Sequence, residues 1–358
     1  MAKPSNRSFP IQNTQVILGN SNSNFSGVTS TMLQTFPIQL NHLNVMVMGK
    51  HHVEDESFVL GFWQAVKLCI RTLPNNKKRV FHARRNNEMI QALVLKYFFL
   101  AKIDIVFTST AQRHHSKFTR LLMGKMDAVI STCSMAAKYL KTPPKKIIPH
   151  GIQTKRFVPI EQKSDITKRY NIKTDKCVGI FGRVRAQKGV DLFVNANIEV
   201  LQYHTDVTAV ICGAILPSEQ TFVDALKAKI EKAGLTDRIL FLGEQPFDDI
   251  PKIMASMDLN CALSINEGFG LTVLESMASQ VPVIATDAGA WRDIIIENEN
   301  GFIIEVGDED QLKEKLLWCF SNNDQLTQMG VNGKEYILHN FKVEREAQLL
   351  CEFYQSLS

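Results

Sequence analysis

Long apolar runs are absent from this sequence, and so is an apolar N-terminal segment. The longest runs, such as residues 97–101, fall far short of the roughly 20 residues needed to span a bilayer. The opening residues MAKPSNRSFPIQNTQ are polar and lack the apolar centre of a secretory signal. We therefore expect a protein that is soluble or peripherally bound to a membrane.

Cysteine pairs and low-complexity tracts are absent as well. The chain has 7 Cys, an odd number, and no Cys-x-x-Cys motif. They stand singly in mostly apolar segments, which is typical of reduced core residues in a cytoplasmic protein. With 45% hydrophobic and 22% charged residues, the composition is that of a globular protein.

Acidic residues are scarce in the first 150 residues, which hold 20 Lys and Arg against 6 Asp and Glu, a net charge of +14. The remainder carries −9. The basic half favours an anionic partner, namely nucleic acid, acidic lipid headgroups or a phosphorylated substrate, although a generally solvated basic surface is the alternative. No helix-turn-helix, zinc-finger or RNP pattern is present, so we do not expect nucleic acid. Candidates for the footprint are Lys77, Lys78, Arg79, Arg113, Lys117 and Arg120.

Short β-branched runs alternate with helical stretches along the whole chain. At 358 residues the chain exceeds the size at which one core usually stops growing, which predicts two domains. Apolar strands separated by helices, including helices over 58–72 and 87–101, indicate parallel sheets covered on both faces. We predict an α/β fold with doubly wound domains over 1–152 and 174–340. A linker over 153–173 would join them, and a C-terminal helix over 341–358 would pack back on the first domain.

Two turns in the second half are candidates for a ligand site. Arg183 and Lys188 lie between a predicted strand and a predicted helix, at the edge where open α/β sheets bind ligands. Such cations could hold a diphosphate. Further on, Glu267 and Glu275 bracket a glycine turn and a helix start, whose backbone N–H groups favour an oxygen-rich ligand. Carboxylates without Cys or His suit sugar hydroxyls better than a transition metal, and a buried βαβ unit with a polar cap is the alternative.

These motifs resemble family 4 of the retaining glycosyltransferases. The matching segments are Phe-Gly-Arg183-(x)4-Lys188-Gly, Gly-Glu244, Glu267-Gly-Phe-Gly-Leu-Thr-Val-Leu-Glu275 and Pro282-Val-Ile-Ala-Thr-Asp287. The resemblance implies a GT-B fold, with two Rossmann-like domains, a cleft between them and a helical C-terminal tail. The C-terminal domain would hold a nucleotide-sugar donor and the N-terminal domain the acceptor. Transfer would retain the anomeric configuration without a metal or a cofactor, the departing phosphate oxygen taking the acceptor's proton.

The resemblance also implies roles for individual residues. Arg183, Lys188 and Glu267 would be catalytic, with Arg183 and Lys188 holding the donor diphosphate and Glu267 contacting the donor sugar. Glu275 would contact the ribose. The remaining donor contacts would be made by Gly268, Phe269, Gly270, Leu271 and Thr272, and by Gly27 in the first half.

The first half matches through fewer residues. Family members often carry a His at the end of a middle strand, where this chain has Thr110, with His114 and His115 slightly later. His114 is therefore the catalytic candidate. The candidates for contact with the acceptor are His82, Arg84, His114 and His115.

The chain as a whole is similar to the bacterial lipopolysaccharide-core mannosyltransferases of this family, through segments such as Phe81-His-Ala-Arg-Arg-Asn-Asn-Glu-Met. This similarity implies transfer of mannose from GDP-mannose to the inner core on a Kdo–lipid A acceptor. The enzyme would be cytoplasmic and attached peripherally to the anionic inner face of the membrane through its basic half. The alternatives are a family member that uses a UDP-sugar on another lipid or glycan, and a non-catalytic protein that binds a nucleotide sugar or nucleic acid.

Overall fold

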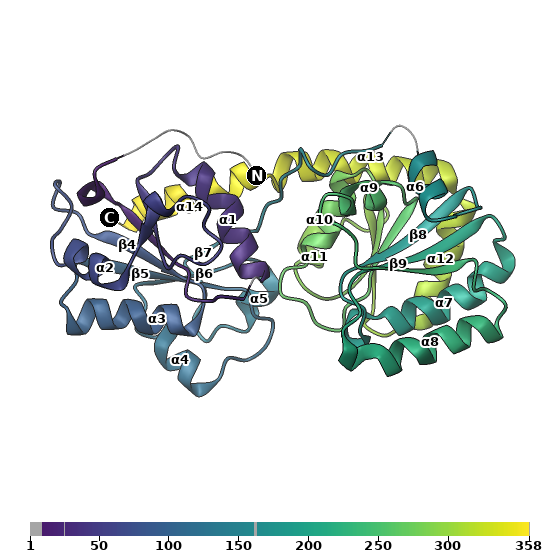
Figure 1. The fold of residues 1–358 in the computed structure, drawn as a ribbon, viewed down its shortest axis with the longest axis horizontal. Helices are drawn as coiled ribbons and strands as arrows, with labels where there is room; N and C mark the ends of the chain where they lie inside the picture. The colour runs from purple at the N-terminus through teal and green to yellow at the C-terminus, as the bar shows by residue number, and fades with distance from the viewer. Residues whose placement is uncertain (1–8, 25, 161–162, 358) are drawn as a thin grey trace. The chain divides into compact units, whose positions relative to one another are not determined.

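The structure, a computed structural model, describes residues 9–24, 26–160 and 163–357. The chain divides into two compact units (Figure 1). The first combines Met1–Gly151 with Lys342–Ser358, and the second is Ile152–Phe341. Each unit is built on a parallel sheet, which confirms the α/β class and the two Rossmann-like units expected from the sequence.

Within the described residues, the sheet of the first unit has seven strands in the order β3-β2-β1-β4-β5-β6-β7, and all pairs are parallel. The interior strand β1 is buried along its whole length, with Val16, Ile17 and Leu18 at most 1% exposed. Such a strand needs helices on both faces. The strands are β1 (Val16–Gly19), β2 (Val45–Met48), β3 (Val59–Leu60), β4 (Arg79–Ala83), β5 (Ile103–Ser109), β6 (Ala128–Ser131) and β7 (Lys146–Ile147).

The last helix of the chain belongs to the first unit. Helix α14 (Val343–Leu357) packs against α1 (Gly27–Gln39), and its residues Leu350 and Phe353 join the core around β1. The two helices run side by side in Figure 1. The other helical segments of this unit are η1 (Ile11–Asn13), η2 (Glu56–Phe58), α2 (Phe62–Cys69), α3 (Asn86–Leu93), the π-helical turn η3 (Val94–Phe98), α4 (Lys117–Met123) and α5 (Ser134–Lys138).

The second unit has a six-stranded parallel sheet within the described residues, in the order β10-β9-β8-β11-β12-β13. Its strands are β8 (Lys176–Phe181), β9 (Val207–Cys212), β10 (Ile239–Gly243), β11 (Leu259–Ala262), β12 (Val283–Thr286) and β13 (Gly301–Ile304). Its helices are α6 (Ser164–Arg169), η4 (Ala186–Lys188), α7 (Val190–Tyr203), η5 (Pro217–Glu219), α8 (Gln220–Lys232), α9 (Ile250–Ala255), α10 (Leu271–Ala278), α11 (Trp291–Ile294), α12 (Glu309–Ser321) and α13 (Asn323–Asn340).

The structure differs from the sequence analysis at three segments. The helix expected over 87–101 is divided, because α3 ends at Leu93 and the π-helical turn η3 follows it to Phe98. The helix expected over 58–72 is shorter, because Val59 and Leu60 pair with β2 as an edge strand and α2 begins only at Phe62. Residues 153–173, expected as a linker, are part of the second unit and include α6. Tertiary contacts hold this segment, since Tyr170 Oη donates to Gln245 Oε1 at 2.6 Å and Lys163 pairs with Asp258.

A helix that crosses a bilayer must be both long and apolar. Among the helices in the described part of the chain, none combines the length and the apolar character needed to cross a membrane.

Candidate functional site

The candidate donor residues of the second unit lie at the carboxyl ends of β8 and β11. After β8 the chain turns through Gly182, at φ 129°, and forms the short helix η4. It then passes Gly189 at φ 70°, where an added Cβ would stand 2.2 Å from the Leu263 carbonyl oxygen. Glycine is therefore required at this position, and it allows the loop after β8 to touch the loop after β11.

The contact between these loops brings Lys188 and Glu267 together. The Lys188 ammonium forms a short ion pair with Glu267 Oε2, which also accepts from Ser264 Oγ at 3.3 Å. The backbone supports the pair, because the Ile265 N–H donates to the Gln187 carbonyl at 2.9 Å. A lysine and a glutamate that the sequence analysis assigned to one ligand thus meet in the folded chain.

Arg183, the second predicted cation, is exposed after β8. Within the described residues it has no ion-pair partner among the bridges of this unit. The Lys188 stem passes close by, since Lys188 Cε lies 3.9 Å from the position of a Cβ on Gly182. One cation is therefore held by a carboxylate, and the other is open to solvent beside the same turn.

The turn between Glu267 and α10 is fixed from behind by a tryptophan. Gly270 has φ 84°, and an added Cβ would stand 2.3 Å from Trp291 Nε1. That nitrogen donates to the Gly270 carbonyl at 2.9 Å, and the Ala290 N–H donates to the Phe269 carbonyl at 3.0 Å. These bonds occupy the carbonyl groups of the turn. The first amides of α10, at Leu271 and Thr272, are the donors that a helix start leaves for an anion or a hydroxyl.

Glu275 lies one turn further along α10 and is half-buried. Burial raises the pKa of its carboxyl to about 7, and the nearby Arg156 guanidinium opposes this shift. Arg156 itself stacks on the Phe247 ring, 3.2 Å from its centroid, and donates to the Phe247 carbonyl. Sequence reasoning missed both residues, because Arg156 lies in the segment assigned to a linker and no motif marks Phe247.

A metal site needs several His, Cys, Asp or Glu side chains close together. Among the described residues, no group of three or more His, Cys, Asp or Glu side chains is arranged to hold a metal ion.

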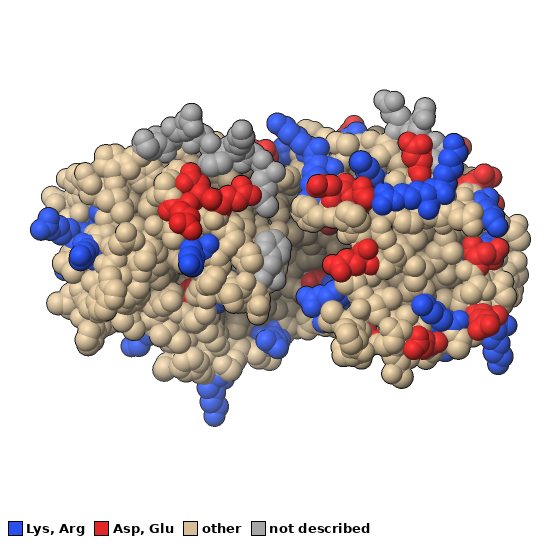
Figure 2. All heavy atoms as spheres, viewed as in Figure 1, with Lys and Arg blue, Asp and Glu red and all other residues tan. Residues whose placement is uncertain are grey.

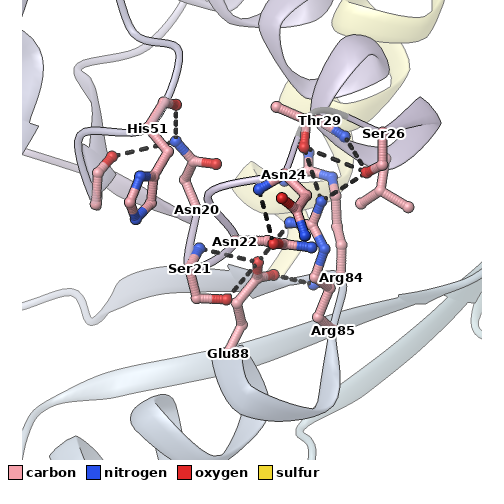
Figure 3. A network of polar contacts seen from close by, with 12 residues as sticks. Asn20, Ser21, Asn22, Asn24, Ser26, Thr29, His51, Arg84, Arg85 and Glu88 are labelled. Atoms are coloured by element: carbon pink, nitrogen blue, oxygen red, sulfur yellow. Dashed lines mark hydrogen bonds and ion pairs between the residues drawn. The ribbon is translucent and has the colours of Figure 1, made fainter.

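In the first unit, a buried glutamate organises the loop after β1 (Figure 3). Glu88 of α3 is 0% exposed. Its Oε1 accepts from the Ser21 N–H at 3.3 Å, the Ser21 hydroxyl at 3.1 Å and Arg85 Nη1 at 2.9 Å, and its Oε2 accepts from the Arg84 N–H at 2.7 Å. Arg85 Nη2 then reaches Ser26 Oγ at 3.0 Å. Sequence reasoning missed Glu88, although a lone acid in so basic a segment is a signal of a buried ion pair.

The two glycines that flank this loop have different roles. Gly19 is buried, and an added Cβ would lie 3.0 Å from the Glu88 side chain. Gly27, the predicted donor-site glycine, is exposed at the first position of α1, and an added Cβ would meet nothing within 4 Å. Packing against Glu88 therefore favours glycine at 19, and no packing contact favours glycine at 27.

His82, a candidate for acceptor contact, is fully buried at 0% exposure. Its Nδ1 lies 2.5 Å from Tyr354 Oη, and its Nε2 lies 2.6 Å from Thr108 Oγ1. Burial lowers the pKa of the imidazole well below its usual value, and the Arg84 guanidinium adds to this shift. His82 has no surface with which to touch an acceptor. Its role is structural, since it ties β4 to β5 and to α14.

The remaining candidates of the first unit are spread over two places. Arg84 is half-buried beside His82, and its Nη1 is enclosed and has no hydrogen-bond partner within the described residues. His115 Nε2 lies 2.9 Å from the hydroxyl of Ser109, the last residue of β5, and burial lowers its pKa. His114 is exposed and its ring packs edge-on against Tyr139, with centroids 5.3 Å apart. Of the two histidines, His115 is the one bound to the end of the strand.

One member of the predicted basic footprint is in the interior. Arg79 is 2% exposed, and its guanidinium donates to the Gln12 carbonyl at 2.7 Å and to the Arg71 carbonyl. It clamps two loops at the amino end of β4, so it is not available to an anionic partner. Lys78 pairs with Asp104 at 3.0 Å and keeps about half of its side chain exposed, at 52%.

The chain is similar in sequence to known proteins. The profile described as Glycosyl transferases group 1 matches residues 162–336. The lipopolysaccharide core biosynthesis mannosyltransferase LpcC of Rhizobium leguminosarum bv. viciae is 38% identical over 97% of this chain and 97% of its own length. LpsB of Rhizobium meliloti, which has the same description, is 38% identical over 97% of this chain and 99% of its own length.

A solved structure is similar in fold to this chain over nearly the whole length of both. Anabaena HepE, determined in complex with UDP and glucose, superposes with a TM-score of 0.76 over 96% of this chain and 100% of its own, at 18% identity. This likeness concerns the fold alone and agrees with the GT-B architecture expected from the sequence. The profile match and the identity to LpcC and LpsB over nearly the whole chain show the family: the chain belongs to the group 1 glycosyltransferases and is a glycosyltransferase.

Proposed function

We propose that this glycosyltransferase moves mannose from GDP-mannose to the inner core of lipopolysaccharide, on an acceptor of the Kdo–lipid A type. The observation that carries the proposal is the 38% identity to two lipopolysaccharide core mannosyltransferases over 97% of this chain. Identity at that level extends over both units, so it includes the acceptor side as well as the donor side.

In the proposed donor complex, Arg183 and Lys188 bind the diphosphate. The Lys188–Glu267 ion pair supports this assignment, because the carboxylate holds the ammonium in place at the turn before the donor arrives. Glu267 then accepts from hydroxyls of the sugar, and Glu275 accepts from the ribose. The open amides at the start of α10 contribute further donors.

The proposed reaction retains the anomeric configuration and needs no divalent metal. As the bond from the anomeric carbon to the phosphate oxygen breaks, negative charge develops on the leaving diphosphate, and the two fixed cations stabilise it. The acceptor hydroxyl attacks from the same face, and its proton passes to the departing phosphate oxygen. This route requires no enzymatic pair of acid and base, unlike the two carboxylates of glycoside hydrolases.

On the acceptor side, the first unit supplies positive charge. The inner core carries phosphate and Kdo carboxylates, and the first 150 residues have a net charge of +14. Arg84, which is partly exposed, and His115, at the end of β5, are the contacts we propose, with His114 at the rim. The acceptor is anchored in lipid, so we propose that the enzyme works as a peripheral protein on the cytoplasmic face of the membrane.

The test is release of nucleoside diphosphate from a panel of GDP- and UDP-sugars, in chelator, with and without Kdo–lipid A. We expect release from GDP-mannose that rises with Kdo–lipid A and a product that keeps the anomeric configuration by NMR. Release from a UDP-sugar alone would contradict the donor, and loss of activity in chelator would contradict the metal-free route. If no donor releases its nucleoside diphosphate, the proposed acceptor is contradicted, because a glycosyltransferase should release it once its own acceptor is present.

Site variants sharpen the same assay. Replacing Arg183 or Lys188 by Ala should lower turnover by about 10²–10³, the usual effect of removing one group that stabilises a developing charge. Glu267→Ala should nearly abolish transfer and leave the fold intact. The exposed Lys232 of α8 gives a control, Lys232→Ala, that removes a cation of the same unit away from this site.

A further inference from the structure

Large apolar side chains are exposed together on the helical side of the first unit. Phe98 is 77% exposed and Leu100 is 69% exposed, and Trp63 and Leu121 are each about two-thirds exposed, at 66% and 65%. Tyr97 and Phe118 are exposed beside them. We name these six residues the apolar ridge. Clustered exposure of this kind marks an interaction surface, because a soluble protein otherwise buries such side chains.

The residues of the ridge come from α2, from the end of η3 and from α4. The Trp63 ring packs edge-on against the half-buried Phe99, with centroids 5.7 Å apart, and Phe98 packs on the same Phe99 at 4.9 Å. Helix α3, which leads through η3 to Phe98, also packs against α4. On α4, Phe118 and Leu121 are three residues apart and therefore share one helix face.

The backbone holds the most exposed part of the ridge outward. The chain leaves α3 through the π-helical turn η3, a rare element that is frequent at functional sites. Leu100 follows at φ 53°, a left-handed conformation that is strained for a bulky residue. Hydrogen bonds on either side fix this geometry, from the Ala101 N–H to the Leu95 carbonyl and from the Lys102 N–H to the Cys69 carbonyl. This left-handed residue closes the end of the helical segment and leaves the Leu100 side chain exposed.

The charge around the ridge is predominantly positive. Residues 57–126 contain 13 Lys and Arg but only 2 acidic residues. Both acids are paired, Glu88 with Arg85 and Asp104 with Lys78. Lys117 and Arg120 are exposed on α4 beside Phe118 and Leu121. In Figure 2, the lower edge of the first unit, where Figure 1 places α3 and α4, carries blue side chains and no red ones.

We propose that the apolar ridge and the basic residues beside it form the surface through which the first unit docks onto an anionic lipid bilayer. Aromatic and aliphatic side chains at a protein surface enter the boundary between headgroups and acyl chains, while lysines and arginines bind the anionic headgroups. The inference rests on the proposed function in one respect, that the acceptor is embedded in a membrane. It adds the location of the docking surface and the contribution of apolar insertion.

Trp63 makes the docking directly measurable. The chain has 3 Trp, and Trp291 is 1% exposed while Trp318 packs against Phe302, so Trp63 is the one that lies on the ridge. Vesicles of phosphatidylglycerol and phosphatidylethanolamine should shift the emission of the full-length protein to shorter wavelength, and brominated acyl chains should quench it. Trp63→Phe should keep binding in a flotation assay and lose most of the quenching. Pure phosphatidylcholine vesicles should bind far more weakly.

Substitutions separate the apolar and the electrostatic contributions. Phe98→Ser and Leu100→Ser should each weaken binding to the anionic vesicles about tenfold. Lys117→Gln and Arg120→Gln should each weaken it about fivefold, and more so at low salt. The matched control is Tyr203→Ser, since Tyr203 is 78% exposed on the second unit, as exposed as Phe98.

Three results would overturn the docking surface. These are failure of the wild-type protein to bind anionic vesicles, unchanged binding by the ridge variants, and an equal loss in Tyr203→Ser. Sedimentation tests whether a second copy of the chain covers the ridge in place of a membrane. A wild-type dimer that Phe98→Ser dissociates would show this and would also overturn the proposal. The proposed reaction is tested separately with a deacylated acceptor. Ridge variants should transfer to that soluble acceptor at the wild-type rate and lose activity only on vesicles.

Discussion

The raised pKa of Glu275 predicts that this residue lowers the stability of the enzyme at neutral pH. Its carboxyl titrates at about 7 in the folded protein and near 4.5 in an exposed setting, because burial disfavours the ionised form. Below pH 4.5 the group is protonated in both folded and unfolded chains. Between the two pKa values the folded chain holds the proton more tightly, so the free energy of unfolding falls as the pH rises.

The size of the effect follows from the shift. At about 1.4 kcal/mol per pKa unit, the interval from 4.5 to about 7 corresponds to about 3 kcal/mol of lost stability above neutral pH. Glu275→Gln keeps the shape of the side chain and removes the charge. We therefore expect the variant to match the wild type at pH 4.5 and to be up to about 3 kcal/mol more stable at pH 8.

The assay is urea denaturation of both proteins at half-unit steps from pH 4.5 to 8.5. Glu231→Gln is the control, because Glu231 is an exposed glutamate on α8 in the same unit. Titration calorimetry with GDP adds a functional measurement. If Glu275 binds the ribose, the Gln variant should gain stability and lose nucleotide affinity. Parallel pH profiles for the wild type and Glu275→Gln would refute the buried, destabilised carboxylate.

Three further predictions concern packing. Glu88→Ala removes the acceptor of two backbone N–H groups and of Arg85 Nη1, while Arg85 Nη2 keeps its bonds to Ser26 and Thr29, and it should destabilise the first unit by about 3 kcal/mol in urea denaturation followed by tryptophan fluorescence; wild-type stability would show that the carboxylate does not hold the loop after β1. Gly270→Ala places a Cβ 2.3 Å from Trp291 Nε1 and should lower the melting temperature by several degrees. Gly27→Ala should leave it unchanged, and equal melting of the two variants would contradict the packing at the turn. All seven cysteines are buried, with the pKa of Cys69 raised to about 12, so a thiol reagent should react only after denaturant is added; a fast thiol in the native protein would contradict this burial.

The sequence by itself was sufficient for the fold and for the composition of the donor-site motifs. Apolar strands that alternate with helices can bury both faces of a sheet only in a parallel, doubly wound arrangement. In that arrangement the carboxyl ends of neighbouring strands share one edge, so motifs that follow two strands must lie close together. The Lys188–Glu267 contact is an instance, since β8 and β11 are adjacent in the sheet.

Tertiary structure alone decided which side chains are enclosed and by which partners. His82 looked like a site residue at a strand end, but its Nδ1 forms a hydrogen bond with the hydroxyl of Tyr354, 272 residues away in the sequence. Arg156 lies in a segment that looked like a linker, yet it lies near Glu275 and stacks on Phe247. Local patterns encode burial and periodicity. They do not encode contacts between distant segments, which depend on how helices pack over the sheet.

The same limit applies to the surface of the first unit. Its positive charge could be counted from the sequence, but Arg79 was counted with the exposed residues and is in the interior. Phe98 and Leu100 lie in the stretch expected as one helix over 87–101, but α3 ends at Leu93 and the π-helical turn and the left-handed Leu100 follow it, with both side chains exposed. The direction of a side chain at the end of a helix depends on backbone angles that packing fixes, so only the folded chain decides it.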